Sequence, residues 1–177
     1  MPNFVYIAAS LDGYIARKDG DISWLNEIPN PEGGDFGFGE FLKKIDAIVM
    51  GRNTFEKVLE FGFWPYDLPV FVLSHTLKNL PEEFTHKVEI VEGGPAAVIE
   101  LLGSRNLHNL YIDGGKTIQS FLEEGLIDDL IITKIPILLG DGIPLFGILP
   151  KEQKFTHIST EILISSLVRS WYKKISV

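Results

Sequence analysis

Three segments of the chain place glycine, hydroxyl or basic side chains directly after a short apolar run. They are Gly51-Arg52-Asn53-Thr54, Ser74-His75 and Asp113-Gly114-Gly115-Lys116-Thr117. Glycines between a strand and a helix let a ligand approach the backbone, and the first N–H groups of a helix carry partial positive charge. Arginine, lysine and hydroxyl groups at the same points add charge and hydrogen bonds. The pattern therefore predicts a site for a phosphorylated ligand.

A glycine pair between a strand and a helix is also a common tight connection. Gly93-Gly94-Pro95 offers a comparison, because no basic residue follows it in the next turn and its proline is well placed to start a helix. We interpret this pair as a structural turn. The two junctions that carry both a basic and a hydroxyl residue favour ligand binding instead. Neither has the spacing of GxGxxG or of a P-loop, so those two nucleotide folds are not supported.

A sheet is needed to bring these segments together. Apolar runs predict buried strands at 4–9, 47–50, 70–73, 88–91, 110–112 and 130–133, followed by a run at 137–139 and an alternating tail at 162–177. Helical patterns lie between them, at 38–45, 55–59, 96–102 and 118–122. This alternation predicts an α/β fold with a mostly parallel sheet, in which ligands bind beyond the carboxyl ends of the strands.

The composition limits the classes of protein. A chain of 177 residues with 45% hydrophobic residues is expected to form one domain over 1–177. It contains no apolar run of spanning length, and its first residues lack the basic start of a signal peptide, so we expect a cytoplasmic protein without membrane partners. Segment 17–39 is rich in Gly, Pro, Asp and Asn, and we expect a long functional loop there.

Charge and the supply of metal ligands exclude further functions. The net charge of −8 argues against a nucleic-acid partner. The chain has no cysteine, which excludes disulfides, thiolate zinc sites and a cysteine nucleophile. The four histidines are scattered without the spacing of metal ligands, so we expect no metal site.

Four longer segments carry a resemblance to a known family. YIAASLDGYIARKDGDISW (6–24), MGRNTFE (50–56), FVLSH (71–75) and DGGKTIQSFL (113–122) resemble the dihydrofolate reductase superfamily in their order and spacing. KIPILLGDGIPLF (134–146) is closer to one branch, the reductase domain of the bacterial riboflavin bifunctional deaminase-reductase and its stand-alone relatives. The resemblance implies a three-layer fold, with helices on both faces of a mostly parallel central sheet and antiparallel C-terminal strands.

The same resemblance implies an activity. It is that of an NADPH-dependent reductase of the riboflavin-biosynthesis type, which passes a hydride to a small heterocyclic or ribosylamine substrate such as 5-amino-6-(5-phosphoribosylamino)uracil. It also implies a homodimer, for which the apolar C-terminal strands around Trp171 are the candidate surface. Two alternatives stay open: a dihydrofolate or pterin reductase proper, and an NADP-binding dimer without catalysis.

Residues of the cofactor site follow from the resemblance by position. Ala8 and Ile15 are implied to flank the nicotinamide, with Asp12-Gly13 at the start of a mobile loop over it. Ser74 and His75 are implied to meet the 2′-phosphate that distinguishes NADPH from NADH. The remaining implied cofactor residues hold the diphosphate and the adenosine side: Gly51, Arg52, Thr54, Gly114, Gly115, Lys116 and Thr117.

The implied substrate side consists of Asp12, Trp24, Asp35 and Phe38. Counting back from Met50 places Asp35 where dihydrofolate reductases carry the acidic residue that binds the substrate ring and assists its protonation. An equal alternative is that Asp35, within Gly-Gly-Asp-Phe-Gly, caps a helix. Trp24 and Phe38 are either stacking walls for the substrate or members of the core.

Three features depart from the resemblance. Asp113 stands where dihydrofolate reductases prefer a small residue, and it either places a negative charge near the diphosphate or caps the next helix. Ile118 replaces an aromatic residue. The riboflavin enzyme is usually fused to a zinc deaminase, for which this chain has neither cysteines nor room. These departures leave the riboflavin step itself open.

Overall fold

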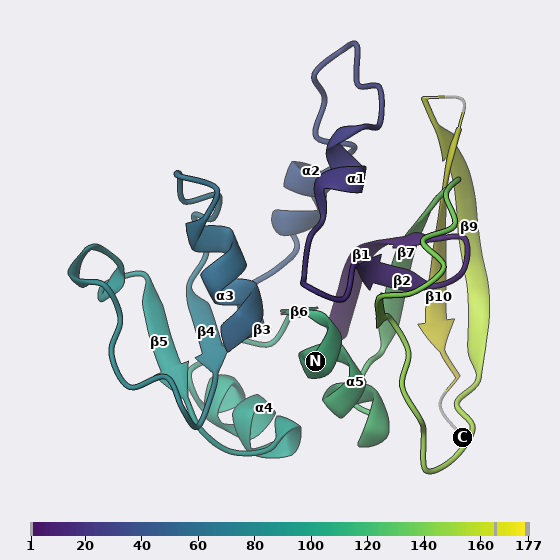
Figure 1. Cartoon of the computed structure of the whole chain (residues 1–177). Helices are drawn as coiled ribbons and strands as arrows, with labels where there is room; N and C mark the ends of the chain where they lie inside the picture. The colour runs from purple at the N-terminus through teal and green to yellow at the C-terminus, as the bar shows by residue number, and fades with distance from the viewer. Residues whose placement is uncertain (1, 165, 176–177) are drawn as a thin grey trace.

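The computed structural model describes residues 2–164 and 166–175. One central sheet has the strand order β5-β4-β3-β6-β1-β7-β10-β9 (Figure 1). Its strands are β1 (Asn3–Ser10), β3 (Ala47–Gly51), β4 (Val70–Leu73), β5 (Val88–Val91), β6 (Leu110–Asp113), β7 (Asp129–Ile135), β9 (Phe155–Leu163) and β10 (Leu167–Lys174). All neighbouring strands from β5 to β7 pair in parallel, while β10 runs antiparallel to both β7 and β9. The predicted α/β fold class is confirmed.

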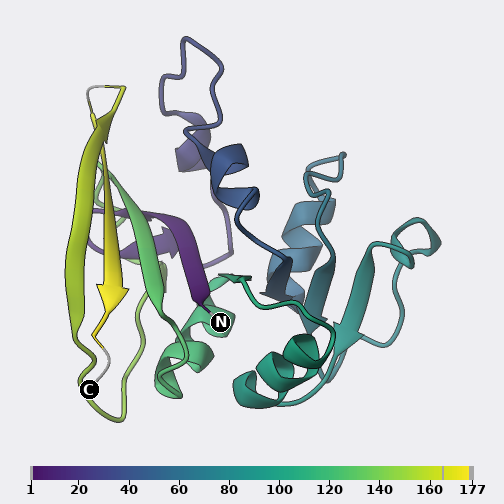
Figure 2. The same cartoon turned by 180° about the vertical axis from the view of Figure 1, so that it is seen from behind.

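Helices cover both faces of this sheet (Figures 1 and 2). On one face α2 (Phe38–Leu42) and α3 (Arg52–Leu59) pack over Ile48 and Met50. On the other, α4 (Pro95–Ser104) and α5 (Gly115–Glu123) pack over Val49 and Ile112. Because successive side chains of a strand point to opposite faces, an unbroken apolar run such as Ala47–Met50 supplies both cores. Two shorter helices, α1 (Ser23–Asn26) and η1 (Glu82–Phe84), lie in the connections.

The order of the strands opens a crevice between β3 and β6. These two strands are neighbours, with Val49 opposite Ile112 and Met50 opposite Asp113. From β3 the chain passes through α3 to β4 on one side, whereas from β6 it passes through α5 to β7 on the other side. Helices that leave adjacent parallel strands in opposite directions leave a crevice at the carboxyl edge, which is where sheets of this kind bind ligands.

A second, two-stranded sheet of β2 (Tyr14–Ala16) and β8 (Ile143–Pro144) lies at the same edge. Two sequence expectations were wrong in detail here. The expected loop over 17–39 contains α1, and the apolar run at 137–139 lies in the connection from β7 to β8 instead of in a strand. Pro136 explains the second point, because it has no N–H to continue the ladder of β7. No helix within the described ranges has the length and apolar character that a membrane crossing requires.

Candidate functional site

The N-termini of α3 and α5 meet at two glycine–threonine contacts. A Cβ added to Gly114 would lie 2.1 Å from the hydroxyl oxygen of Thr54, and one added to Gly51 would lie 2.8 Å from that of Thr117. The two contacts are reciprocal, because each glycine precedes one helix and each threonine belongs to the other. Only glycine allows this approach, and Gly114 also has a φ of +90°. The glycines predicted from the sequence are therefore required by close packing.

This contact concentrates groups that attract anions. The first N–H groups of a helix have no acceptor within the helix, and here two helices present them at neighbouring strand ends. The hydroxyls of Thr54 and Thr117 lie at the contact itself. Arg52 and Lys116 are exposed in the first turns of α3 and α5. The arrangement suits a ligand with more than one phosphate.

The end of β4 extends this group. Arg52 Nη1 donates a 3.0 Å hydrogen bond to the hydroxyl of Thr76. The buried Ser74 Oγ accepts the backbone N–H groups of Thr76 at 3.2 Å and Leu77 at 3.0 Å, so this hydroxyl shapes the turn. His75 and Thr76 are exposed beside it. Sequence reasoning missed Thr76, although a hydroxyl residue directly after Ser74-His75 was a usable signal.

The small sheet covers the start of α5. A Cβ added to Gly115 would lie 2.9 Å from Cδ1 of Ile15 and 3.1 Å from Cγ2 of Ile143. One residue of β2 and one of β8 therefore rest on the backbone of Gly115. The structure thus places Ile15 against the start of α5, whereas the resemblance implied that it flanks the nicotinamide.

Asp12 holds the chain on either side of the small β2–β8 sheet in place. Its carboxylate accepts the Ser10 hydroxyl at 2.5 Å and the backbone N–H groups of Leu139 at 3.2 Å and Gly140 at 2.7 Å. The Ser10 hydroxyl, followed by the backbone donors, lowers the pKa of Asp12. Asp12 therefore ties the end of β1 to the connection between β7 and β8, and its position is that of an anchor for the loop.

The start of α4 differs from that of α5, where the Asp113 carboxyl accepts the N–H of the N-cap residue Gly114. The Glu124 carboxylate accepts the backbone N–H of Ala96 at 3.3 Å, so a protein anion occupies this helix end. A Cβ added to Gly94 would lie 3.5 Å from Glu124, which is an ordinary contact. This geometry fits the interpretation of Gly93-Gly94-Pro95 as a structural turn.

Asp35 caps α2. Its two carboxylate oxygens accept the backbone N–H groups of Gly37 and Gly39, each at 2.8 Å. These two bonds, the one from Gly39 first, lower the pKa of the exposed Asp35, which is therefore ionised near neutral pH. The sequence left Asp35 open as a helix N-cap or as a substrate-binding acid. The N-cap residue is Gly37, and Asp35 satisfies backbone N–H groups from two residues before it.

Phe38 belongs to an aromatic group on the α2 face of the sheet. Its ring centroid lies 5.6 Å from that of Tyr6 and 6.0 Å from that of Tyr111, and Phe41 stacks on Tyr6 at 4.6 Å. Phe38 is only partly buried, so part of the ring remains open to a ligand.

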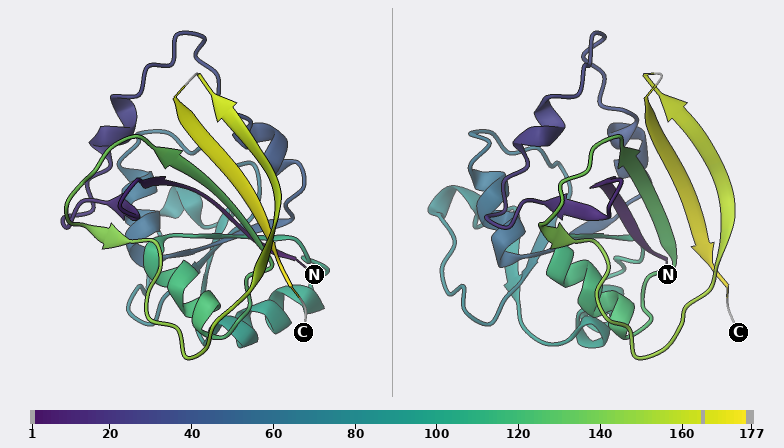
Figure 3. Two further views of the ribbon diagram at one scale, coloured as in Figure 1. Left: turned by 90° about the vertical axis from the view of Figure 1, so that its right-hand side faces the viewer. Right: turned by 45° about the vertical axis from the view of Figure 1, so that its right-hand side comes forward.

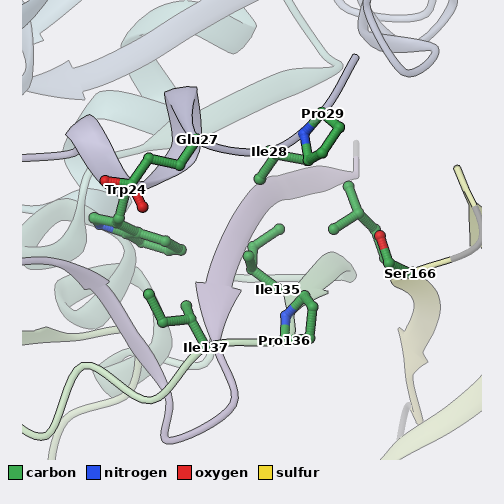
Figure 4. Close-up of a pocket in the computed structure, with 9 residues that line it drawn as sticks. Trp24, Glu27, Ile28, Pro29, Ile135, Pro136, Ile137 and Ser166 are labelled. Atoms are coloured by element: carbon green, nitrogen blue, oxygen red, sulfur yellow. The ribbon is translucent and has the colours of Figure 1, made fainter. Parts of the chain in front are cut away.

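Trp24 lies in a different cluster. Its side chain is only 1% exposed and packs with Ile135 and Leu167, and Ala8 packs against the same cluster. Figure 4 shows the mainly apolar cavity beside it, of about 180 Å³. Its lining residues are Trp24, Glu27, Ile28, Pro29, Ile135, Pro136, Ile137, Ser166 and Leu167. The structure thus separates Trp24 from Phe38, with which it was paired as a stacking wall.

Asp113 is the last residue of β6 and is partly buried. Its Oδ1 accepts the backbone N–H of Gly114 at 2.8 Å. Burial raises the pKa of Asp113 to about 6, and the Gly114 N–H and the Tyr111 hydroxyl oppose this only in part. The carboxyl lies close enough to Tyr66 to help raise the pKa of that phenol. Asp113 therefore holds a proton at a pH where Asp35 does not.

The sequence matches the RibD C-terminal domain family over residues 4–168. The chain belongs to this family. Among curated relatives, the uncharacterized protein YwjB of Bacillus subtilis is 39% identical over 153 residues, which cover 85% of each chain. The uncharacterized protein YyaP of the same organism is 25% identical over 182 residues and covers 94% of this chain and 91% of its own.

Solved structures are also similar to this chain. A protein of Shewanella sp. PV-4, provisionally assigned to riboflavin biosynthesis, is 47% identical with a TM-score of 0.96, over 99% of this chain and 100% of that one. The Thermotoga maritima diaminohydroxyphosphoribosylaminopyrimidine deaminase/5-amino-6-(5-phosphoribosylamino)uracil reductase is 17% identical with a TM-score of 0.72 and shares the fold. The match covers 98% of this chain and 56% of that longer one.

In this RibD-type domain most of the predicted cofactor residues converge. One group joins Ile15, Gly51, Arg52, Thr54, Gly114, Gly115, Lys116 and Thr117 at the starts of α3 and α5. Ser74 and His75 adjoin it through the bond between Arg52 and Thr76. Ala8 and Trp24 form a separate cluster, and Asp35 and Phe38 lie at α2.

The contact between the two helices can be tested by replacing Gly114 with alanine. The added Cβ overlaps Thr54 Oγ1 and sits at an unfavourable φ, so we expect Gly114→Ala to lower the free energy of unfolding by about 2–3 kcal/mol in urea titrations. Gly94→Ala is the matched control, since its Cβ fits, and Thr54→Ala added to Gly114→Ala should restore part of the loss. Equal losses in the two single glycine variants would contradict the reciprocal contact.

The raised pKa of Asp113 predicts a pH-dependent stability. Its folded pKa of about 6 exceeds the unfolded value of 3.8, so the native state holds the proton more tightly and stability falls as the pH rises between these values. Asp113→Asn retains an acceptor for Gly114 N–H without this cost. In urea unfolding, the free energy of unfolding of Asp113→Asn relative to that of wild type should therefore rise by on the order of 2 kcal/mol between about pH 4 and pH 7. A difference that does not change with pH would rule out a desolvated carboxyl.

Proposed function

We propose that the protein is an NADPH-dependent reductase of the riboflavin-biosynthesis type. Its substrate would be a small heterocyclic or ribosylamine compound of the 5-amino-6-(5-phosphoribosylamino)uracil class. The observation that carries the proposal is the reciprocal contact of the α3 and α5 N-termini, which gathers backbone N–H groups, two hydroxyls and two cations at one crevice. Membership of the RibD C-terminal domain family supports the reductase class.

The residues present fit a dinucleotide with a 2′-phosphate. Gly51 and Gly114 bring the hydroxyls of Thr117 and Thr54 against the two helix starts, and Lys116 lies in the first turn of α5. These residues would hold the diphosphate. Arg52 and Thr76, joined by their hydrogen bond, would hold the 2′-phosphate together with His75. When bound, NADPH supplies a hydride.

Reduction also requires a proton, and the two carboxyls at the site differ in their ability to provide one. Asp113, with its pKa raised to about 6 by burial, would hold and release the proton. Asp35, whose pKa is lowered, would remain a carboxylate and accept hydrogen bonds from N–H or O–H groups of the substrate. Phe38, partly buried beside Tyr6, would provide an apolar wall for the ring.

The cofactor preference tests this proposal first. Following tryptophan and nicotinamide fluorescence, we expect NADPH to bind at least ~10-fold tighter than NADH, worth about 1.4 kcal/mol. Arg52→Ala and Thr76→Ala should remove most of that preference. Lys78→Ala is the control, because it removes a positive charge nearby whose partner is Glu92 instead of Thr76.

Each outcome separates the candidate functions. Absence of binding by either nucleotide would refute the proposal. Tight NADPH binding with no turnover of 5-amino-6-(5-phosphoribosylamino)uracil or dihydrofolate would instead favour a non-catalytic NADP-binding protein. Turnover of dihydrofolate alone would favour a dihydrofolate or pterin reductase.

A homodimer is the second part of the proposal. β9 is the edge strand of the sheet (Figure 3). Most of its residues are exposed, and Ile162 is 70% exposed. A long exposed edge with apolar side chains favours pairing with another chain. We propose that a second copy covers β9.

Light scattering tests the assembly. The expected mass is roughly twice the 19.8 kDa of one chain, and Ile162→Lys should shift it towards one chain. Ile148→Lys is the matched control, since Ile148 is 93% exposed but lies outside β9. A wild-type mass near that of one chain would contradict the dimer.

A further inference from the structure

Arg169 lies on β10, far in sequence from the residues discussed so far, and its side chain is only 14% exposed. Its Nε donates to the Glu161 carboxylate of β9 at 2.8 Å. The guanidinium lies over the ring of Tyr6, with 5.6 Å between its central carbon and the ring centroid. A buried arginine with one anionic partner still has N–H groups to satisfy, and these point away from β9.

The remaining donors reach the turn that precedes α2. Arg169 Nη1 donates to the Phe36 carbonyl oxygen and to the Tyr6 hydroxyl, and that hydroxyl donates to the same carbonyl at 3.0 Å. A Cβ added to Gly37 would lie 3.4 Å from Arg169 Nη2, so the guanidinium rests against the Gly37 backbone. Both the segment before α2 and the β9–β10 hairpin rise from the same end of the molecule (Figure 3).

This turn needs an external tether. Phe36 has a φ of +53° and Gly37 a φ of +82°, so two consecutive residues are left-handed and one of them is not glycine. Such backbone persists only where surrounding contacts hold it. Asp35 supplies two of these contacts from within the turn, and Arg169 supplies those from outside.

We propose that Arg169 is a positioning residue, which holds the 35–37 turn so that the Asp35 carboxylate and the Phe38 ring face the substrate. The inference rests on the proposed function, because it assigns these two side chains to the substrate. Tyr6 carries the same tether further, since its ring stacks on Phe41 of α2. Within the described part of the chain, the side-chain contacts of Arg169 are with Tyr6, Phe36, Gly37 and Glu161, and none of these is assigned to the cofactor. We therefore expect its effect on the substrate side.

Two readouts test the proposal, with Arg169→Ala, Arg169→Lys and Tyr6→Phe as variants. The first is hydrogen exchange of the Gly37 and Gly39 amides, whose N–H groups donate to the Asp35 carboxylate. The second is the steady-state KM for 5-amino-6-(5-phosphoribosylamino)uracil, measured beside the Kd for NADPH. We expect Arg169→Ala to speed exchange and raise KM by about 10-fold with the Kd for NADPH unchanged. Arg169→Lys and Tyr6→Phe, which keep the charge or the ring, should give smaller changes in the same direction.

Glu161→Gln is the matched control, because it weakens the ion pair of Arg169 and leaves the bonds to Phe36 and Tyr6 in place. It should change exchange and KM by less than about twofold. Equal effects of Glu161→Gln and Arg169→Ala, or protected amides and an unchanged KM in Arg169→Ala, would overturn the proposal. If wild type binds NADPH without turnover, the proposed function fails, while the exchange comparison still decides whether Arg169 tethers the turn.

Discussion

The close approach of two helix N-termini is the constraint on which the site depends. Thr54 of α3 fills the space that a side chain at residue 114 would need, and Thr117 of α5 does the same for residue 51. The approach is possible because β3 and β6 are neighbours whose following helices leave on opposite faces. Strand order, helix placement and glycine positions are thus parts of one arrangement. The small β2–β8 sheet then completes it through Ile15 on Gly115.

Asp35 and Asp113 show how environment sets the protonation of one chemical group. Asp35 is exposed and accepts two backbone N–H groups, so it stays ionised. Asp113 is partly buried beside Tyr111 and Tyr66, and its pKa is raised to about 6. Sequence alone left Asp35 open as the acid or a helix cap, because position relative to Met50 says nothing about desolvation. The raised pKa of Asp113 depends on tyrosines that only the tertiary structure brings near it.

Most of the fold was predictable because its signals are local. Buried parallel strands are unbroken apolar runs, and each of those from 47–50 to 130–133 became a strand. The strand-to-helix connections that contain glycine could be predicted equally well, since strand, glycine and helix are consecutive in the sequence. The run at 137–139 did not identify its own secondary structure, because its apolar residues follow Pro136 and lie in a loop. The sequence left Trp24 open between a stacking wall and the core, because a helix of four residues has too few turns to show which face is buried; the structure places it in the core.

Contacts between segments that lie far apart in the sequence could not be predicted from the local pattern of residues. Arg169 meets Phe36 across most of the chain, and nothing near residue 169 identifies its partner. Thr76 gained its meaning only when Arg52 was found to donate to it. Such pairs are set by strand order and register, which follow from the packing of the whole sheet.

The protonation of Asp113 has a thermodynamic consequence for any anion that binds at the crevice. A negative charge beside this carboxyl raises its pKa further, so binding takes up a proton in the pH range above about 6. By linkage the affinity for the anion must then weaken as the pH rises, even if the phosphate groups themselves do not titrate. The calorimetric heat of binding will consequently depend on the ionisation enthalpy of the buffer. The slope of that dependence gives the number of protons that binding takes up, to which Asp113 contributes.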